Sequence, residues 1–227
     1  YPITVLRTNF PDEPENEEPD DDEPAREVVY VTEYGAAVPA WVELDTGRWM
    51  ARHWLLPVAM MGLAGVFTFL MLTVISGFLW LVLGCVFLLW RYWNGVRHTF
   101  RHGNANPGRI VSVEPPLVAV WSDLDSTGTE GPVAPAVKVL RYPLKTVLGQ
   151  PLEWGLAVPT ASTYCGSEKA DAWTDFKPLF LEEGCGDAVA LHEVLARIPE
   201  WQWAELDGAV QRLSAEGKLK PGLWRLE

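Results

Sequence analysis

The residues most capable of catalysis lie together in Asp123-Leu124-Asp125-Ser126-Thr127, directly after the apolar segment 117–121. An aspartate that follows a buried strand can serve as the nucleophile of a phosphatase, and a second aspartate two residues later can serve as its general acid and base. Such an enzyme also holds a metal ion through carboxylates. The motif therefore raises phosphoryl transfer as one hypothesis.

Other requirements of that chemistry are missing from the sequence. Haloacid-dehalogenase-type phosphatases, which carry such a nucleophile loop, need a doubly wound sheet, a later lysine and a distal acidic pair. The residues that follow Thr127 show no alternation of strands and helices of that kind. The motif itself consists of common turn residues. We therefore expect residues 122–131 to form a polar hairpin loop, and the sequence predicts no catalytic residue.

Histidine and cysteine spacing offers a weaker signal for a metal or haem site. His98 and His102 are four residues apart, so one face of a helix would present both. The arginines beside them favour a juxtamembrane basic cluster that attracts anionic lipid instead. Cys165 and Cys185 are twenty residues apart, and no other histidine or cysteine stands near them at metal-binding spacing. We expect no bound metal and no cofactor.

The segment from Trp54 to Trp90 contains no charged residue over 37 residues. One helix of that length would span about 55 Å, well beyond the roughly 30 Å hydrocarbon core of a bilayer. Two helices of about 17–20 residues fit if the chain turns once, and Ser76-Gly77 is the natural breaker. We therefore predict a transmembrane helical hairpin within residues 48–103.

Aromatic and basic residues at the ends of this segment support the hairpin. Tryptophan and tyrosine collect at membrane interfaces, and basic residues flank both ends of the hairpin but not its turn. We therefore expect two spans in the bacterial cell membrane with both termini in the cytoplasm. The residues expected at the interfaces are Trp49, Trp54, Trp80, Trp90, Tyr92 and Trp93.

The hydrocarbon segment holds no aspartate, glutamate, lysine, arginine or histidine, although transport and proton relay normally need such groups. The hairpin is therefore expected to be an anchor and a packing surface. Gly62, Ala64 and Gly65 would let a neighbouring helix approach closely.

The N-terminal arm, residues 1–47, contains a strongly acidic stretch in which nine of twelve residues are acidic. Without that stretch the formal net charge would change from -12 to -3. A solvated, self-repelling linker has this composition. We hypothesise instead that the arm binds a basic surface of a partner protein, with the apolar ranges 1–10 and 28–34 as strand-like anchors. Its partner-binding residues would be Asp12, Glu13, Glu15, Glu17, Glu18, Asp20, Asp21, Asp22 and Glu23.

Residues 104–227 have the pattern of a separate cytoplasmic domain. Turn residues occupy 104–108, and four β-branched segments follow between glycine and proline residues. Asp187 can cap the first of two amphipathic helices. The pattern predicts an α+β fold in which a small antiparallel, barrel-like sheet precedes two C-terminal helices. The expected strands are 109–113, 117–121, 136–142 and 156–164, and the expected helices are 187–198 and 200–213.

Four motifs stand out in this domain. They are residues 106–113, Val139-Leu140 with Pro143-Leu144, Val158-Pro159-Thr160 with Tyr164, and Ile198-Pro199-Glu200 with Trp203 and Leu206. These motifs resemble those of an actinobacterial, membrane-anchored family of unknown function found in corynebacteria and their relatives, and the resemblance covers roughly the last 120 residues. It implies a bacterial domain that faces the cytoplasm and assigns no catalytic residue.

These features favour a non-catalytic accessory or scaffolding subunit of a larger bacterial membrane complex. Its expected partners are other membrane-protein subunits and anionic lipid at the cytoplasmic face. Nucleic acid is not expected, because the chain outside the hairpin lacks a basic stripe and the acidic arm would repel phosphate. The actinobacterial respiratory cytochrome bcc-aa3 supercomplex is one hypothesis for the complex. The alternatives are a membrane-anchored ligand-binding or sensory domain and the phosphatase.

Overall fold

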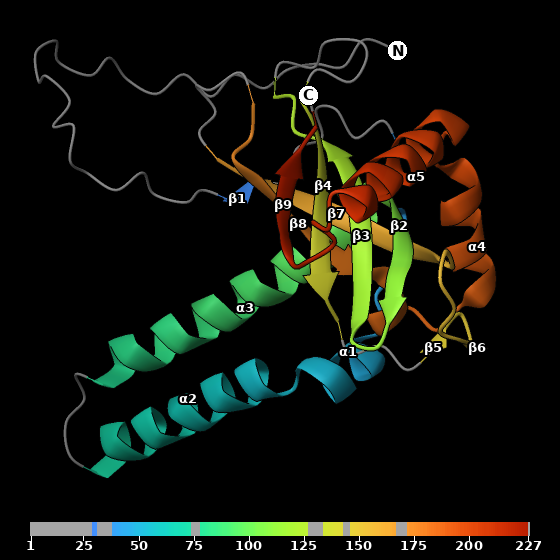
Figure 1. Cartoon of the computed structure of the whole chain (residues 1–227). Coiled ribbons are helices and arrows are strands. Elements are labelled where there is room, and N and C mark those ends of the chain that lie inside the picture. Colours follow the sequence, from blue (N-terminus) through green and yellow to red (C-terminus); the bar gives the residue numbers. More distant parts are fainter. Residues whose placement is uncertain are drawn as a thin grey trace, which may run out of the picture.

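The protein consists of two long apolar helices, a strongly curled antiparallel sheet and two further helices packed on the sheet (Figure 1). The computed structural model describes residues 29–30, 38–73, 78–126, 134–142, 146–166 and 172–226. The α+β architecture predicted from the sequence is confirmed, including the two apolar helices ahead of a sheet that forms half of a barrel.

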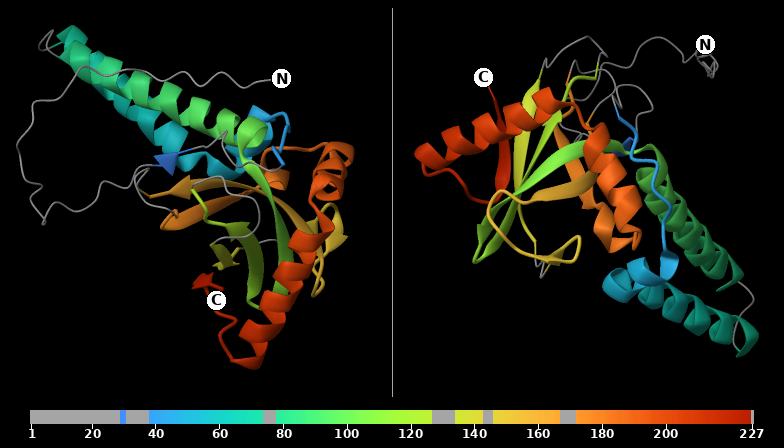
Figure 2. Two further views of the ribbon diagram at one scale, coloured as in Figure 1. Left: turned by 90° about the horizontal axis from the view of Figure 1, so that it is seen from above. Right: turned by 90° about the vertical axis from the view of Figure 1, so that its right-hand side faces the viewer.

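Three helices precede the sheet. A short amphipathic helix, α1 (Thr46–His53), leads into α2 (Leu55–Thr73), and α3 (Leu79–His102) returns the chain to the domain. We call α2 and α3 together the hairpin. They lie side by side and project from the domain on the side away from α5 (Figures 1 and 2). The expected breaker Ser76-Gly77 lies outside the described residues, between these two helices.

The main sheet is antiparallel throughout, and its strands follow the order β1, β7, β2, β3, β4, β9, with β8 also paired to β7. A separate small ribbon pairs β5 with β6. The strands are β1 (Val29–Tyr30), β2 (Asn104–Val113), β3 (Pro116–Asp123), β4 (Pro135–Arg141), β5 (Thr146–Val147), β6 (Gln150–Pro151), β7 (Ala157–Cys165), β8 (Asp175–Phe180) and β9 (Gly222–Arg225).

The expectation that residues 104–108 form a turn was wrong, because these residues are the first half of β2. Pro107 lies opposite Pro159 of β7, and the pairing of β2 with β3 starts only at Gly108. Pairing of β7 with β8 likewise starts only at Thr160, so the missing N–H groups of the two prolines remove no hydrogen bond from the sheet. Gly108 is required by close strand approach, since a Cβ atom there would lie 2.8 Å from the carbonyl oxygen of Val158.

Both faces of the central strands are buried, which explains their nearly continuous apolar runs. On β3, Val118 and Val120 point into the curl of the sheet, whereas Ala119 and Trp121 point outward against α5. The helices α4 (Ala188–Arg197) and α5 (Glu200–Ala215) cover the outer face, and the side chain of Asp187 caps α4 as predicted. A 3-10 turn, η2 (Leu181–Glu183), joins β8 to this layer.

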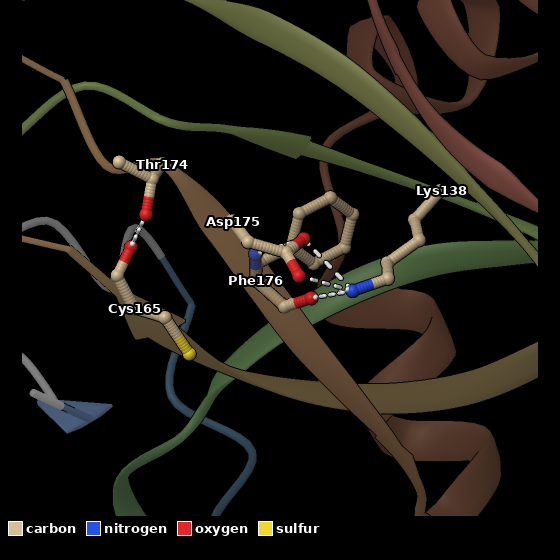
Figure 3. Close-up of polar contacts among 5 residues, drawn as sticks. All are labelled: Lys138, Cys165, Thr174, Asp175 and Phe176. Carbon is tan, nitrogen blue, oxygen red and sulfur yellow. Dashed lines mark hydrogen bonds and ion pairs between the residues drawn. The ribbon is translucent and has the colours of Figure 1, made fainter. Parts of the chain in front are cut away.

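An ion pair joins two strands that are not neighbours in the sheet (Figure 3). Lys138 Nζ of β4 lies 2.8 and 2.7 Å from the two carboxylate oxygens of Asp175 on β8, and it also donates to the carbonyl of Phe176 at 2.7 Å. The rings of Tyr142 and Phe180 stack across the same gap with centroids 4.0 Å apart. These contacts hold β4 and β8 close together and so keep the half-barrel curved.

We predict that Lys138→Met opens this gap and lowers the free energy of unfolding by about 1–3 kcal/mol, because Asp175 and the Phe176 carbonyl lose a charged donor. Chemical denaturation of the full chain in mild detergent measures the change. The control is Lys218→Met, which removes a solvent-exposed pair with Glu216 and should change the free energy of unfolding far less. Equal losses in the two variants would contradict a closing role for Lys138.

Candidate functional site

The aspartate motif lies at the end of β3. Asp123 Oδ1 accepts hydrogen bonds from the backbone N–H groups of Asp125 at 3.1 Å and Ala134 at 2.9 Å, so this carboxylate joins the two ends of the β3–β4 connection. The strand before it runs antiparallel to both neighbours, unlike the doubly wound sheet that the phosphatase hypothesis requires. The described part of the motif thus has the arrangement of a hairpin loop, and Thr127 lies outside the described residues.

Histidines and cysteines do not form a metal centre in the described part of the chain, where no three potential ligands come together. The rings of His98 and His102 lie near each other on α3, with centroids 4.7 Å apart. Cys165 and Cys185 are both buried and unbridged. Burial raises the pKa of the Cys185 thiol, which disfavours the reactive thiolate.

A polar cluster that the sequence did not predict lies inside the half-barrel, centred on the hydroxyl of Tyr164. Asn104 Nδ2 donates to this hydroxyl at 2.9 Å, and Ser122 Oγ lies 2.8 Å from it. Burial raises the pKa of the Tyr164 phenol, so the hydroxyl keeps its proton at neutral pH. All three side chains are buried, which suits a structural network that fixes the register of β2, β3 and β7.

The segment 38–42, which precedes the hairpin in the chain, pairs with the end of α3, and we call this contact the clamp. The last carbonyl groups of a helix have no partner within the helix, and here a preceding chain segment supplies their donors. The backbone N–H groups of the segment donate to carbonyl groups at the end of α3: Ala40 to Gly103 at 3.0 Å, Trp41 to Arg101 at 3.1 Å, and Val42 to Phe100 at 3.0 Å.

Further contacts keep the clamp in place. Ala105 N–H donates to the carbonyl of Val38 at 2.8 Å, which extends the contact into β2. Arg197 of α4 donates to the carbonyl of Ala40 at 2.7 Å. Trp41 has a φ of 49°, a left-handed conformation that a bulky residue keeps only when its surroundings impose it.

The helix α1 is fixed to the domain by a buried carboxylate. Glu183 accepts from His53 Nε2 at 3.0 Å and pairs with Arg52 at 3.5 Å. At the other end of α1, Asp45 caps the helix by accepting from the N–H of Arg48 at 3.0 Å. These contacts determine where the first helix of the hairpin leaves the domain.

Trp49, one of the residues expected at the membrane interface, packs inside the junction between α1, α3 and the domain. Its side chain is only 5% exposed, and its indole N–H donates to the Tyr92 hydroxyl at 2.8 Å while its ring packs edge-on against Phe100. The indole is therefore a core residue of the junction, because α1 folds back onto the domain. Tyr92 and Trp93 pack partly against the same core, whereas Trp54, Trp80 and Trp90 are exposed.

Large apolar side chains cover the outside of the hairpin. Of 22 exposed large hydrophobic residues in the described part of the chain, 17 lie between Trp54 and Trp90. Both α2 and α3 are long and apolar enough to cross a membrane. Gly62 and Gly65 face open space, with no atom within 4 Å of a Cβ placed there, so α3 does not use them for packing. Ala64 is half-buried.

The two helices of the hairpin differ in their charge-free length. The 19 residues of α2 cover about 28 Å, but α3 is uncharged only from Leu79 to Trp90, about 18 Å. The helix then continues through Arg91 to His102, where the domain begins. An arginine at the depth of the hydrocarbon core must either extend its side chain to the membrane–water interface or pair with an anion.

A cleft of roughly 1890 Å³ lies where the hairpin meets the domain, and we call it the juxtamembrane cleft. The walls come from α1, the start of α2, the second half of α3, and the ends of β4 and β8. Apolar residues such as Met60 and Leu88 line one part, and arginines from α3 and β4 line another. No sequence pattern indicated this cleft, because its walls come from segments far apart in the chain.

The acidic stretch proposed to bind a partner lies outside the described residues, so the structure places none of its nine carboxylates. The backbone of β1, at Val29–Tyr30, is the described part nearest to it in the chain. β1 pairs antiparallel with the end of β7, where Val29 lies opposite Cys165.

The fold and surface define the class: an α+β protein with an apolar helical hairpin that is a candidate to span a membrane. The chain belongs to the family described as a protein of unknown function (DUF3239), whose model matches residues 92–214. The match begins within α3, so the apolar part of the hairpin and the N-terminal arm lie outside it. The family resemblance expected from the domain motifs is thus confirmed at the level of a domain of unknown function.

One solved structure is also similar to this chain. It is a crystal structure of a protein described provisionally as a membrane protein from Corynebacterium diphtheriae, with 19% sequence identity and a TM-score of 0.43. The similarity covers 54% of this chain and 99% of that one. No curated protein matches the chain.

We predict that Glu183→Gln loosens α1, because Arg52 and His53 lose their carboxylate partner at a cost of about 1–3 kcal/mol. Hydrogen exchange of the α1 amides should then accelerate by about tenfold for each 1.4 kcal/mol of lost stability. Glu193→Gln, on the exposed face of α4, is the matched control and should leave the exchange unchanged. Unaltered α1 exchange in Glu183→Gln would show that this carboxylate does not hold the helix.

Proposed function

We propose that the protein is a non-catalytic accessory or scaffolding subunit of a larger bacterial membrane complex, anchored by the hairpin in the cell membrane. The observation that carries the proposal is the distribution of exposed apolar surface. Most of the exposed large hydrophobic residues lie on the hairpin, whereas α4 and α5 cover the apolar outer face of the sheet. A surface of this kind fits lipid and neighbouring helices.

The clamp supports an orientation in which the arm and the domain share one side of the membrane. Hydrogen bonds join Ala40 to Gly103, so the chain enters and leaves the hairpin at one place. Arg91, Arg97 and Arg101 of α3 lie near that place, and basic residues favour the cytoplasmic side. Both termini would then be cytoplasmic, and the acidic arm would be free to bind a basic surface of another subunit.

The packing face proposed for a neighbouring subunit contains Gly62 and Gly65. Both glycines face open space in this structure, and small residues let helices approach closely within a membrane. The domain would brace the complex from the cytoplasmic side. An actinobacterial respiratory supercomplex is one particular assembly that partner identification would test, and no residue of the chain selects it.

The proposal predicts stoichiometric co-purification with membrane-protein partners when the tagged full-length chain is extracted from its host in mild detergent. Gly62→Leu combined with Gly65→Leu should reduce partner recovery at least several-fold, because leucine side chains keep the neighbouring helix away. Quantitative mass spectrometry measures the recovery.

Gly208→Leu is the matched control, because Gly208 also faces open space but lies on α5 of the domain. That variant should recover partners like the unchanged protein. The absence of any stoichiometric partner would contradict the subunit proposal. Full recovery by the glycine double variant would contradict the assignment of this face.

A further inference from the structure

The lining of the juxtamembrane cleft combines apolar residues of the hairpin, which we call its apolar part, with basic residues of α3, β4 and β8, which we call its basic part. Apolar residues of the domain, such as Leu140 and Leu179, line it as well. Leu56 and Met60 of α2, with Leu88 of α3, line the part beside the hairpin. Arginines and histidines of α3, Arg141 of β4 and Lys177 of β8 line the part beside the domain. A volume of roughly 1890 Å³ exceeds that of a compact small-molecule pocket, about 300–1,000 Å³, so an occupant extends along the cleft.

Four arginines of the basic part have no carboxylate partner among the residues that the structure describes. Arg91, Arg97, Arg101 and Arg141 are all exposed, and none of them forms an ion pair in the described part of the chain. Glu183 is the carboxylate among the lining residues, and it is already paired with Arg52 and His53. The cleft is therefore cationic and complementary to an anion.

The guanidinium group binds a phosphate with two parallel hydrogen bonds, which makes an arginine cluster a characteristic phosphate site. A free phosphate would need only the basic part of the cleft. The apolar part has its walls on α2 and α3, the two helices of the hairpin. A molecule that fits both parts has an anionic phosphate head and a hydrocarbon tail.

Arg91 strengthens this assignment. It lies directly after the charge-free part of α3 and lines the cleft together with Trp90 and Met60. If the tip of the hairpin reaches the far side of the bilayer, Arg91 is roughly 10 Å deeper than the start of α2. A phosphate seated in the cleft would neutralise this guanidinium at a depth where water is scarce.

We propose that the juxtamembrane cleft binds one anionic phospholipid, with the phosphate at the arginines of α3 and β4 and the acyl chains along the hairpin. The inference rests on the proposed function, because the cleft meets lipid only if the hairpin is in the membrane. The bound lipid fills the junction between membrane anchor and domain, and it makes the docking of the subunit depend on membrane composition.

Gly95 provides a steric test that leaves every charge in place. It lines the cleft on the same helix as the arginines, and a Cβ placed there meets no atom within 4 Å. Gly95→Trp therefore fills the cleft without a clash within the protein. Gly208→Trp, at an equally open glycine of α5, is the matched control.

The experiment titrates the purified full-length chain in mild detergent with phosphatidylglycerol or with phosphatidylcholine of the same acyl chains, and native mass spectrometry counts the bound lipid. We expect one retained phosphatidylglycerol and at least about tenfold weaker retention of phosphatidylcholine. Gly95→Trp should weaken phosphatidylglycerol binding by a similar factor, and Gly208→Trp should not.

A second variant tests the charges. Arg97→Gln with Arg101→Gln should weaken phosphatidylglycerol binding, whereas the charge-matched control Arg212→Gln with Lys220→Gln should bind like the unchanged chain. Inorganic phosphate at the same concentration should not displace the lipid. Equal binding of both lipids, unchanged binding in both cleft variants, or displacement by phosphate alone would each overturn the inference.

Carbonate extraction of the cell membranes separates the two proposals. A chain that stays in the membrane but fails the lipid titration contradicts only the lipid site. A chain that carbonate releases contradicts the membrane anchor on which both proposals rest.

Discussion

The capping of α3 by residues 38–42 is the constraint on which the rest of the structure depends. The last carbonyl groups of a helix have no hydrogen-bond donor within the helix. Where the helix ends inside a domain these groups are buried, and leaving them without donors would destabilise the fold. The N–H groups of the clamp satisfy them and fix the segment before α1 beside the end of α3. With Glu183 fixing α1, the hairpin leaves the domain as a defined extension.

The same junction explains why the two helices of the hairpin are unequal. α2 begins where α1 has left the domain, whereas α3 continues past Arg91 until the clamp receives it at Phe100. The second half of α3 therefore belongs to the domain on one side and faces the juxtamembrane cleft on the other. The apolar hairpin and the folded domain thus share one continuous helix.

Local signals in the sequence were sufficient for part of this structure. The charge-free run predicted the hairpin, and Asp187 marked the start of α4.

Residues 104–108 were misjudged because their proline and glycine look like turn residues, whereas the register with β7 accommodates both. β8 was not predicted, since residues 175–180 mix charge, proline and aromatic residues without alternation. Trp49 looked like an interface residue because only tertiary folding brings it beside Tyr92. The cleft had no local signal at all.

Accessibility labelling tests the central claim most directly, which is that the chain crosses the membrane twice and returns to the side it left. Gly47→Cys, Ser76→Cys and Lys218→Cys would each be treated with a membrane-impermeant maleimide before and after permeabilisation. The native cysteines are buried and give little background. We predict that only Ser76→Cys reacts in intact cells, and that the other two react after permeabilisation. Reaction of Gly47→Cys and Lys218→Cys from opposite sides would contradict the account.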